Sequence, residues 1–157
     1  MDDVLLDQIL VGSAASLANL VIHALLLGIV AWNVRNLSLR DTRIPGFLQY
    51  TLVIVAVGTL LVMGHFSEVL IWAHTYDWVD ATPPGTDLIY LAFGNYTTLG
   101  YGDVKPVEKW HLLGPMTALN GIMLIGWSTA LIIDILRRTG HAADRSLKPA
   151  DDIEPAS

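Results

Sequence analysis

Long apolar stretches alternate with short polar ones along the chain. Residues 13–32 carry no formal charge and match the length of about 20 residues that a helix needs to cross the hydrocarbon core of a bilayer. A second apolar stretch runs from residue 47 to about residue 74; it is uncharged as far as residue 66 apart from His65, and Glu68 lies in its last turns. Residues 112–133 form a third uncharged stretch. The pattern therefore predicts three transmembrane helices.

Polar segments frame these three stretches. Residues 2–11 mix aspartates with apolar residues, which indicates a short helix that lies at the membrane interface or leads into the first span. Residues 33–46 predict a polar loop, and residues 75–86 predict a turret-like loop that ends in prolines and glycine. Residues 137–157 are polar and contain two prolines, so we expect them to form a disordered tail.

A short helix is expected between the second and third spans. Thr86 is a suitable N-cap residue, and Asp87 would lie in the first turn of a helix over residues 87–97. This helix is too short to cross a bilayer. It is followed by an extended, glycine-containing strand, and a short helix with such a strand is typical of a re-entrant loop, which is tolerated at membrane depth where it lines a watery path.

The strand reads Thr-Thr-Leu-Gly-Tyr-Gly-Asp over residues 97–103. Glycine tolerates positive φ, which other L-residues avoid. Alternating such residues with ordinary ones turns successive carbonyl groups toward one side of the strand. Four such strands around one axis would stack rings of carbonyl oxygens that can replace the water shell of a potassium ion.

Residues 98–102, Thr-Leu-Gly-Tyr-Gly, resemble the selectivity filter of the potassium channel pore-domain family, with Leu99 where that family usually has valine. The resemblance covers about residues 47–136. It implies an outer helix over 47–74, a turret over 75–86, a pore helix over 87–97 and an inner helix over 110–136. Residues 1–46, which contain the first span and a cytoplasmic loop, are an addition to this pore domain.

The resemblance implies that the filter backbone coordinates K⁺. Carbonyl oxygens of Thr98, Leu99, Gly100 and Tyr101, together with the Thr98 hydroxyl, would surround dehydrated ions, and Gly102 would complete the strand. K⁺ is then a permeating ligand, and no cofactor and no catalytic residue is expected. One chain supplies a quarter of each ring, so we expect a C4 homotetramer in which each chain has three identical partners.

Side chains behind the filter are expected to support it. Several potassium channels carry a glutamate four residues before the first threonine of the filter, and this chain has Gly94 there. We expect Glu68, with His65 three residues earlier on the same helix face, to support the filter from the second span by hydrogen bonds near Asp103 or the Tyr101 backbone. The alternative is that both side chains face the water of the turret.

Gly121 and Gly126 are candidate hinges of the inner helix, because this family often bends its inner helix at a glycine. Close packing of helices against the small residue is the alternative role for both positions. Asn19 and His23, four residues apart in the first span, share a face and are expected to pack against or bond a neighbouring span.

Composition and charge agree with a membrane protein. The chain of 157 residues is 53% hydrophobic, its mean hydropathy is +0.50 and only 15% of its residues are charged. The net charge of −6 argues against nucleic-acid binding. Most Lys and Arg residues lie in the 33–46 loop and the tail. The positive-inside rule therefore predicts a multi-pass protein of the cell inner (plasma) membrane with its N-terminus outside and its C-terminus in the cytoplasm.

The expected fold is thus an all-α membrane protein with three transmembrane helices, a re-entrant pore helix and a filter loop. The predicted function is passive, potassium-selective conduction. A weakly selective cation channel and a non-conducting membrane subunit or sensor with the same fold are the alternatives. An enzyme is not expected, because the sequence places no nucleophile–base pair and no metal-ligand spacing at a common depth.

Overall fold

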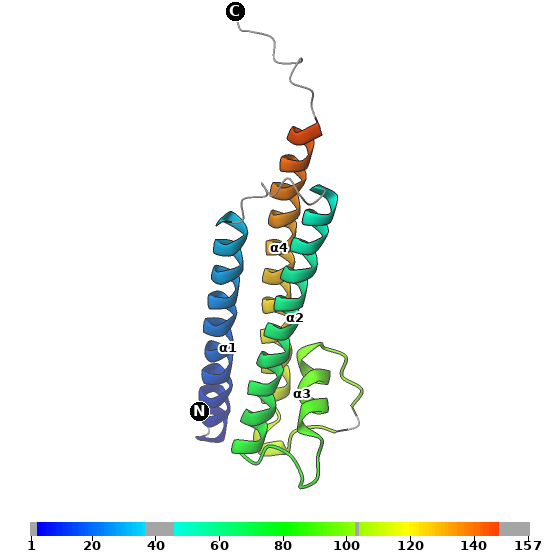
Figure 1. The fold of residues 1–157 in the computed structure, drawn as a ribbon. Helices are drawn as coiled ribbons and strands as arrows, with labels where there is room; N and C mark the ends of the chain where they lie inside the picture. Colours follow the sequence, from blue (N-terminus) through cyan, green and yellow to red (C-terminus); the bar gives the residue numbers. More distant parts are fainter. Residues whose placement is uncertain (1–2, 37–45, 103, 148–157) are drawn as a thin grey trace, which may run out of the picture.

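The computed structural model describes residues 3–36, 46–102 and 104–147, and their side chains over 3–34, 47–102 and 104–137. Three long helices dominate it: α1 (Asp3–Asn36), α2 (Gly46–Trp78) and α4 (Leu113–Leu147) (Figure 1). A short helix, α3 (Leu88–Tyr96), and a 3-10 turn, η1 (Glu108–Trp110), lie between α2 and α4 in the chain. Each long helix is long and apolar enough to cross a membrane, so the chain is an all-helical membrane protein over the part that the structure describes.

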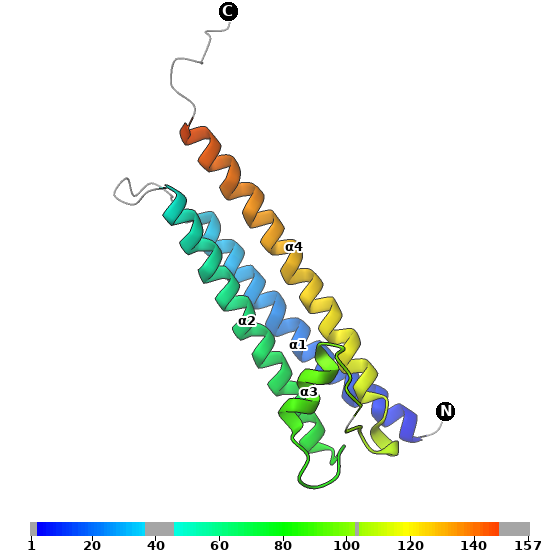
Figure 2. The ribbon, with the colours of Figure 1, turned by 90° about the vertical axis from the view of Figure 1, so that its right-hand side faces the viewer.

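The three long helices lie side by side, and α3 is placed at one end of them. The helices α1 and α4 begin at the same end, and α2 runs in the opposite direction. Because α3 follows the end of α2, it lies near the start of α1 (Figures 1 and 2). Helix α1 packs against both α2 and α4, and α3 also packs against both. The end of α3, where the loop begins, is therefore held beside two of the three long helices.

The ends of the helices refine the boundaries expected from the sequence. Helix α1 is continuous from Asp3, so residues 3–11 lead directly into the first span. Helix α2 runs to Trp78, beyond the expected end near residue 74. The N-cap of α3 is Asp87, whose carboxylate accepts a hydrogen bond from the Tyr90 backbone N–H at 3.0 Å. The expected cap, Thr86, instead donates its hydroxyl to the Pro83 carbonyl at 2.8 Å.

The expectation of a disordered tail from residue 137 is corrected as far as residue 147. Helix α4 continues to Leu147 without a break. Residues 139–147 contain no proline, and extending an existing helix adds a backbone hydrogen bond for each residue that is fixed, without a new nucleation cost. Residues 148–157 lie outside the described residues.

The core has two apolar clusters with a polar layer between them. The cluster around α3 is centred on large buried side chains such as Trp72, Tyr76 and Leu113, and also contains Trp110. The cluster at the other end joins Val30, Val57, Leu61 and Ile135. Buried polar side chains lie between the two clusters, and they come from all three long helices: Asn19, His23, Glu68, Asn120 and Ser128. Buried polar groups need partners, so this layer constrains which helix faces can meet.

The start of α1 is tied to the start of α4 by a side chain that the sequence analysis did not single out. Gln8 is buried, and its Oε1 accepts a hydrogen bond from the Leu112 backbone N–H at 2.8 Å. This N–H precedes the first turn of α4 and would otherwise lack an intrahelical acceptor. The bond fixes the relative height of the two helices.

Gly121 brings α4 into contact with the end of α3. A Cβ atom at Gly121 would overlap the backbone carbonyl of Tyr96, whereas a Cβ atom at Gly126 would meet no atom within 4 Å. Of the two roles considered for Gly121, the structure thus supports close packing. Its role as a hinge and that of Gly126 stay predictions.

We predict that Gly121→Ala destabilises the protein by about 1–3 kcal/mol, because the added methyl group must push α4 away from a backbone carbonyl that cannot yield by a rotamer change. Gly126→Ala is the matched control; it should be neutral or stabilising by up to about 1 kcal/mol, since alanine favours the helix. Thermal unfolding in detergent, followed by circular dichroism, measures both. Equal effects of the two substitutions would contradict the close contact.

Candidate functional site

The loop after α3 alternates between two backbone conformations. Thr98, Gly100 and Gly102 have positive φ values of 59°, 53° and 80°, while Leu99 and Tyr101 between them do not. Positive φ is costly for a β-branched residue, so Thr98 is a backbone outlier of the kind that clusters at functional sites. The loop is attached to α3 by a hydrogen bond from the Gly100 N–H to the Gly94 carbonyl at 3.2 Å.

Much of the loop is open in the single chain. The side chains of Leu99 and Tyr101 are 56% and 64% exposed, and the Tyr101 ring stacks on Tyr90 of α3 with ring centroids 6.4 Å apart. Behind the loop lies a cavity of about 420 Å³. Its walls come from α3, the loop and the start of α4: Gly94, Asn95, Thr98, Gly100, Gly102, Val104, Lys105, Pro106, His111, Gly114, Pro115 and Ala118.

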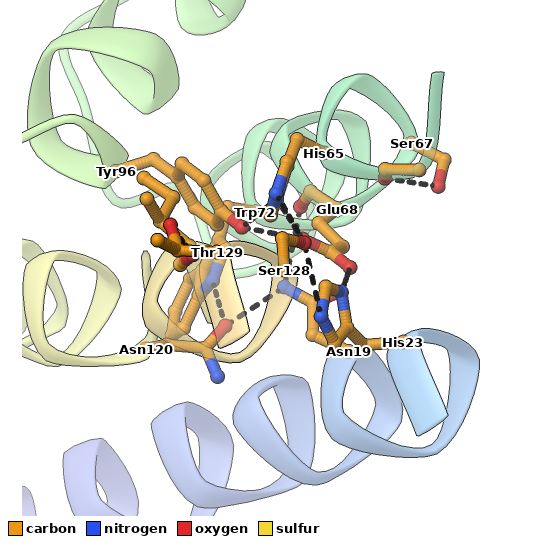
Figure 3. A network of polar contacts seen from close by, with 12 residues as sticks. Asn19, His23, His65, Ser67, Glu68, Trp72, Tyr96, Asn120, Ser128 and Thr129 are labelled. Carbon is orange, nitrogen blue, oxygen red and sulfur yellow. Dashed lines mark hydrogen bonds and ion pairs between the residues drawn. The ribbon is translucent and has the colours of Figure 1, made fainter. Parts of the chain in front are cut away.

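A completely buried carboxylate lies close to this loop. Glu68 has no exposed surface, and its carboxylate bonds three side chains from three helices (Figure 3). His23 Nδ1 of α1 lies 2.7 Å from Oε1, and His65 Nδ1 of α2 lies 3.0 Å from Oε2. The phenol of Tyr96, the last residue of α3, donates to Oε2. Glu68 thus connects α1 and α2 to the end of α3.

The contacts of Glu68 differ from those expected for a residue that supports the filter. Glu68 reaches the loop through Tyr96, two residues before Thr98, and among the described residues its carboxylate makes no bond to the Tyr101 backbone. The contact expected with Asp103 lies outside the described residues. Complete burial of Glu68 also contradicts the alternative that it faces the water of the turret. His65 does join Glu68, as the spacing of three residues predicted.

The network extends from Glu68 into α4. Ser128 Oγ lies 3.0 Å from His65 Nε2 and 3.4 Å from His23 Nε2, so one hydroxyl faces both imidazole rings. Asn120 Oδ1 accepts hydrogen bonds from Asn19 Nδ2 and from Trp72 Nε1, each at 3.0 Å. Asn19 Nδ2 also donates to the Glu68 carbonyl at 3.3 Å. All three long helices and α3 therefore share one polar network.

A second, smaller network also holds the end of α3. The Tyr76 hydroxyl lies 2.7 Å from Thr117 Oγ1 of α4 and accepts a hydrogen bond from Asn95 Nδ2 of α3 at 3.0 Å. Tyr76 and Thr117 have no exposed surface. The penultimate and last residues of α3, Asn95 and Tyr96, are thus each bonded to the long helices immediately before the loop begins.

Sequence reasoning missed most of these partners. It singled out Asn19 and His23 as residues that pack against or bond a neighbouring span, and this is confirmed. It did not single out Tyr96 or Tyr76. It also found no metal-ligand spacing, but the fold brings His23, which is 45 residues from Glu68 in the chain, into direct contact with that carboxylate. The signal that could have found these residues is the presence of polar side chains within apolar spans.

Comparison with known protein families finds a match to one family model. Residues 64–138, just under half of the chain, match the model of the family Ion_trans_2, described as ion channel. The match begins in the second half of α2 and includes α3, the loop and most of α4, whereas α1 lies outside it. No curated protein and no solved structure matches the chain.

We predict that Tyr96→Phe lowers the free energy of unfolding by about 1.5–3 kcal/mol, because it removes a hydrogen bond to a buried carboxylate. Tyr90→Phe in the same helix is the matched control: Tyr90 is half-exposed, and phenylalanine keeps the stacking on Tyr101. Denaturant unfolding in detergent checks both variants. If they unfold at the same denaturant concentration, Tyr96 does not anchor α3 through Glu68.

Proposed function

From the match of residues 64–138 to an ion channel family, we propose that the chain forms a tetrameric, potassium-selective channel. In this proposal α3 is a re-entrant pore helix and residues 98–102 are the selectivity filter. Ions pass through it passively, coordinated by backbone carbonyl groups of Thr98, Leu99, Gly100 and Tyr101 and by the Thr98 hydroxyl.

The observation that carries the proposal is the alternating backbone of residues 98–102. Positive φ recurs at every second residue, at Thr98, Gly100 and Gly102. Such alternation turns successive carbonyl groups toward one side of an extended strand, which is the geometry that a carbonyl-lined ion path needs. The strain at Thr98, which no glycine relieves, supports a functional reason for this conformation.

The exposure of the loop supports assembly around it. One chain provides only one wall of a path, and four symmetric copies would close it into rings. Leu99 and Tyr101 are more than half exposed in the single chain, and the cavity behind the loop is partly open. We infer that adjacent subunits cover these surfaces in the tetramer.

Electrostatics around the loop favour cations. The C-terminal end of α3, which carries the negative end of its helix dipole, precedes the loop at Thr97. Such an end stabilises a nearby cation by about 0.3–1 kcal/mol at exposed sites. Exposed acidic side chains at the same end of the bundle would raise the local cation concentration: Asp3, Asp7, Asp77, Asp80, Asp87 and Glu108. We propose that this end faces the outside and that the end of α4 faces the cytoplasm.

The two networks give the loop its support in this proposal. Asn95 and Tyr96 fix the end of α3 to Tyr76 and Glu68, so the first coordinating residue, Thr98, starts from an anchored position. His65 contributes by bonding both Glu68 and the Tyr96 hydroxyl. Leu99 lacks the β-branch that restricts valine, which makes selectivity the property to measure most carefully.

A flux assay tests the function directly. Purified chain in liposomes should carry K⁺ but not Na⁺ down a gradient, Ba²⁺ should block the flux, and native mass spectrometry should find four chains per particle. Equal K⁺ and Na⁺ fluxes would replace the proposal with a weakly selective cation channel. Four chains without any flux would replace it with a non-conducting subunit or sensor, and a dimer would contradict the ring geometry itself.

We predict that Gly100→Ala lowers K⁺ flux by about tenfold or more, since alanine disfavours positive φ by about 1–2 kcal/mol and the strain is repeated in each subunit around the path. Gly85→Ala is the matched control, because Gly85 also has positive φ (85°) and open space around it, but lies in the loop before α3. It should keep the flux of the unmodified chain. Similar losses in both variants would mean that strain at a glycine, and not the ion path, limits the flux.

A further inference from the structure

Three metal-ligating side chains converge in the polar layer. One ligand atom each from His23, His65 and Glu68 lies within 4.8 Å of the other two. His23 and Glu68 are completely buried, and the His65 side chain is 21% exposed. Both imidazole rings turn Nδ1 toward the carboxylate and Nε2 toward Ser128 (Figure 3). The two histidines thus present the same nitrogen to the two oxygens of one carboxylate.

The neutral side chains of this cluster hold one proton too few to serve every contact, the longest of which is the 3.4 Å contact between Ser128 Oγ and His23 Nε2. Six contacts join the carboxylate, the two imidazoles and the two hydroxyl groups: Glu68 with His23, His65 and Tyr96, Ser128 with each Nε2, and His65 Nδ1 with the Tyr96 hydroxyl. The last contact needs no proton of its own, because one Nδ1–H of His65 can be shared between Glu68 and Tyr96. An ionised carboxylate, two neutral imidazoles and two hydroxyls hold only four protons that can serve the other five contacts. One further proton, or another cation, is needed to satisfy the cluster.

We propose that the cluster is a binding site for a divalent transition metal of the Zn²⁺ class. His23 Nδ1, His65 Nδ1 and the Glu68 carboxylate are three ligands, and the Tyr96 oxygen, which touches both Glu68 and His65 Nδ1, is the fourth. Two imidazoles with oxygen ligands are a donor set that zinc accepts in tetrahedral geometry. Ser128 then accepts Nε2–H from both rings, which is the outer contact that orients metal-binding histidines.

Charge and proton balance favour this assignment. The metal-free cluster that satisfies all six contacts is neutral and holds five such protons, with His65 Nδ1–H shared between Glu68 and Tyr96. With the metal, both rings keep Nε2–H and Ser128 keeps its proton, while Tyr96 binds as phenolate, so three protons remain and two leave to the solvent. The two negative charges of Glu68 and Tyr96 then balance the divalent ion. A neutral site is what a low-dielectric environment at membrane depth requires.

The distances are within reach of metal coordination. Ligand atoms around tetrahedral zinc, bound at about 2.0–2.1 Å, lie about 3.3 Å apart. The Nδ1–carboxylate distances of 2.7 and 3.0 Å would widen slightly, and ligand atoms that now lie up to 4.8 Å apart would move closer together. The ligands come from α1, α2 and α3. The metal would therefore link α1, which lies outside the family match, to Tyr96, two residues before Thr98. Metal binding does not depend on the proposed channel function. An effect of the metal on ion flux would depend on that function.

Metal binding is tested on the purified full-length chain without an affinity tag. The chain is incubated with Zn²⁺ or Co²⁺ and desalted, and its metal content is measured by elemental analysis. We expect one metal ion per chain, a visible Co²⁺ absorption band typical of tetrahedral coordination, and release of two protons per ion in calorimetry. Mg²⁺ should not bind, because it prefers oxygen ligands in octahedral geometry.

Substitutions locate the site. His23→Gln should abolish the Co²⁺ band, whereas His74→Gln, at an exposed histidine of α2, should leave it unchanged. Ser128→Ala should weaken binding by about 10–100-fold while keeping the band, as loss of an outer hydrogen bond does. Circular dichroism and gel filtration establish that each variant is folded. If His23→Gln does not fold, the Ser128→Ala affinity alone decides the matter.

Three results would overturn the proposal. If no metal is retained after desalting, the further positive charge that the cluster needs is a proton shared among these side chains. If His74→Gln removes binding while His23→Gln or Ser128→Ala leaves it intact, the metal binds at the surface. A Co²⁺ spectrum of octahedral type would exclude the four-ligand site. Each outcome is independent of whether the chain conducts K⁺, so failure of the metal site and failure of the channel proposal are distinguishable.

Discussion

The arrangement of this protein depends on keeping one carboxylate out of water. Glu68 is completely buried at the depth of the three spans, where an unpaired charge would cost several kcal/mol. Its partners come from α1, α2 and α3, and the two histidine partners in turn face Ser128 of α4. Satisfying a single side chain therefore sets the relative position of all four helices, and it does so where α3 ends and the loop begins.

Close packing complements these polar contacts. Gly121 allows the backbone of α4 to touch the Tyr96 carbonyl, while the Tyr96 phenol points toward Glu68 on α2. Asn95 is held through Tyr76 by the same two helices. The end of α3 thus meets α4 by steric contact and α2 by hydrogen bonds. This double constraint can hold a strained residue such as Thr98, because strain persists only where the surroundings determine the backbone.

The sequence predicted the elements better than their contacts. Uncharged runs revealed the three spans, since burying charge in lipid is costly, and the glycine spacing after α3 predicted the alternating loop. The partners of Glu68 were not predictable in the same way. An apolar span looks similar on every face, so periodicity does not tell which neighbour a residue such as His23 will meet. The extension of α4 was missed because helix propagation outweighs the weak propensities of a polar segment.

Helix α1 illustrates why contacts matter more than the extent of the family match. It lies outside the matched residues, and most of its large apolar side chains, such as Leu17, Leu25 and Ile29, are exposed. A helix that served only as a membrane anchor would have no reason to carry Asn19 and His23, which are costly in lipid. Both are completely buried, and they bond Glu68 and Asn120. Without α1, the carboxylate would lose one of its three partners and Asn120 one of its two donors, so α1 is part of the structure that supports the loop.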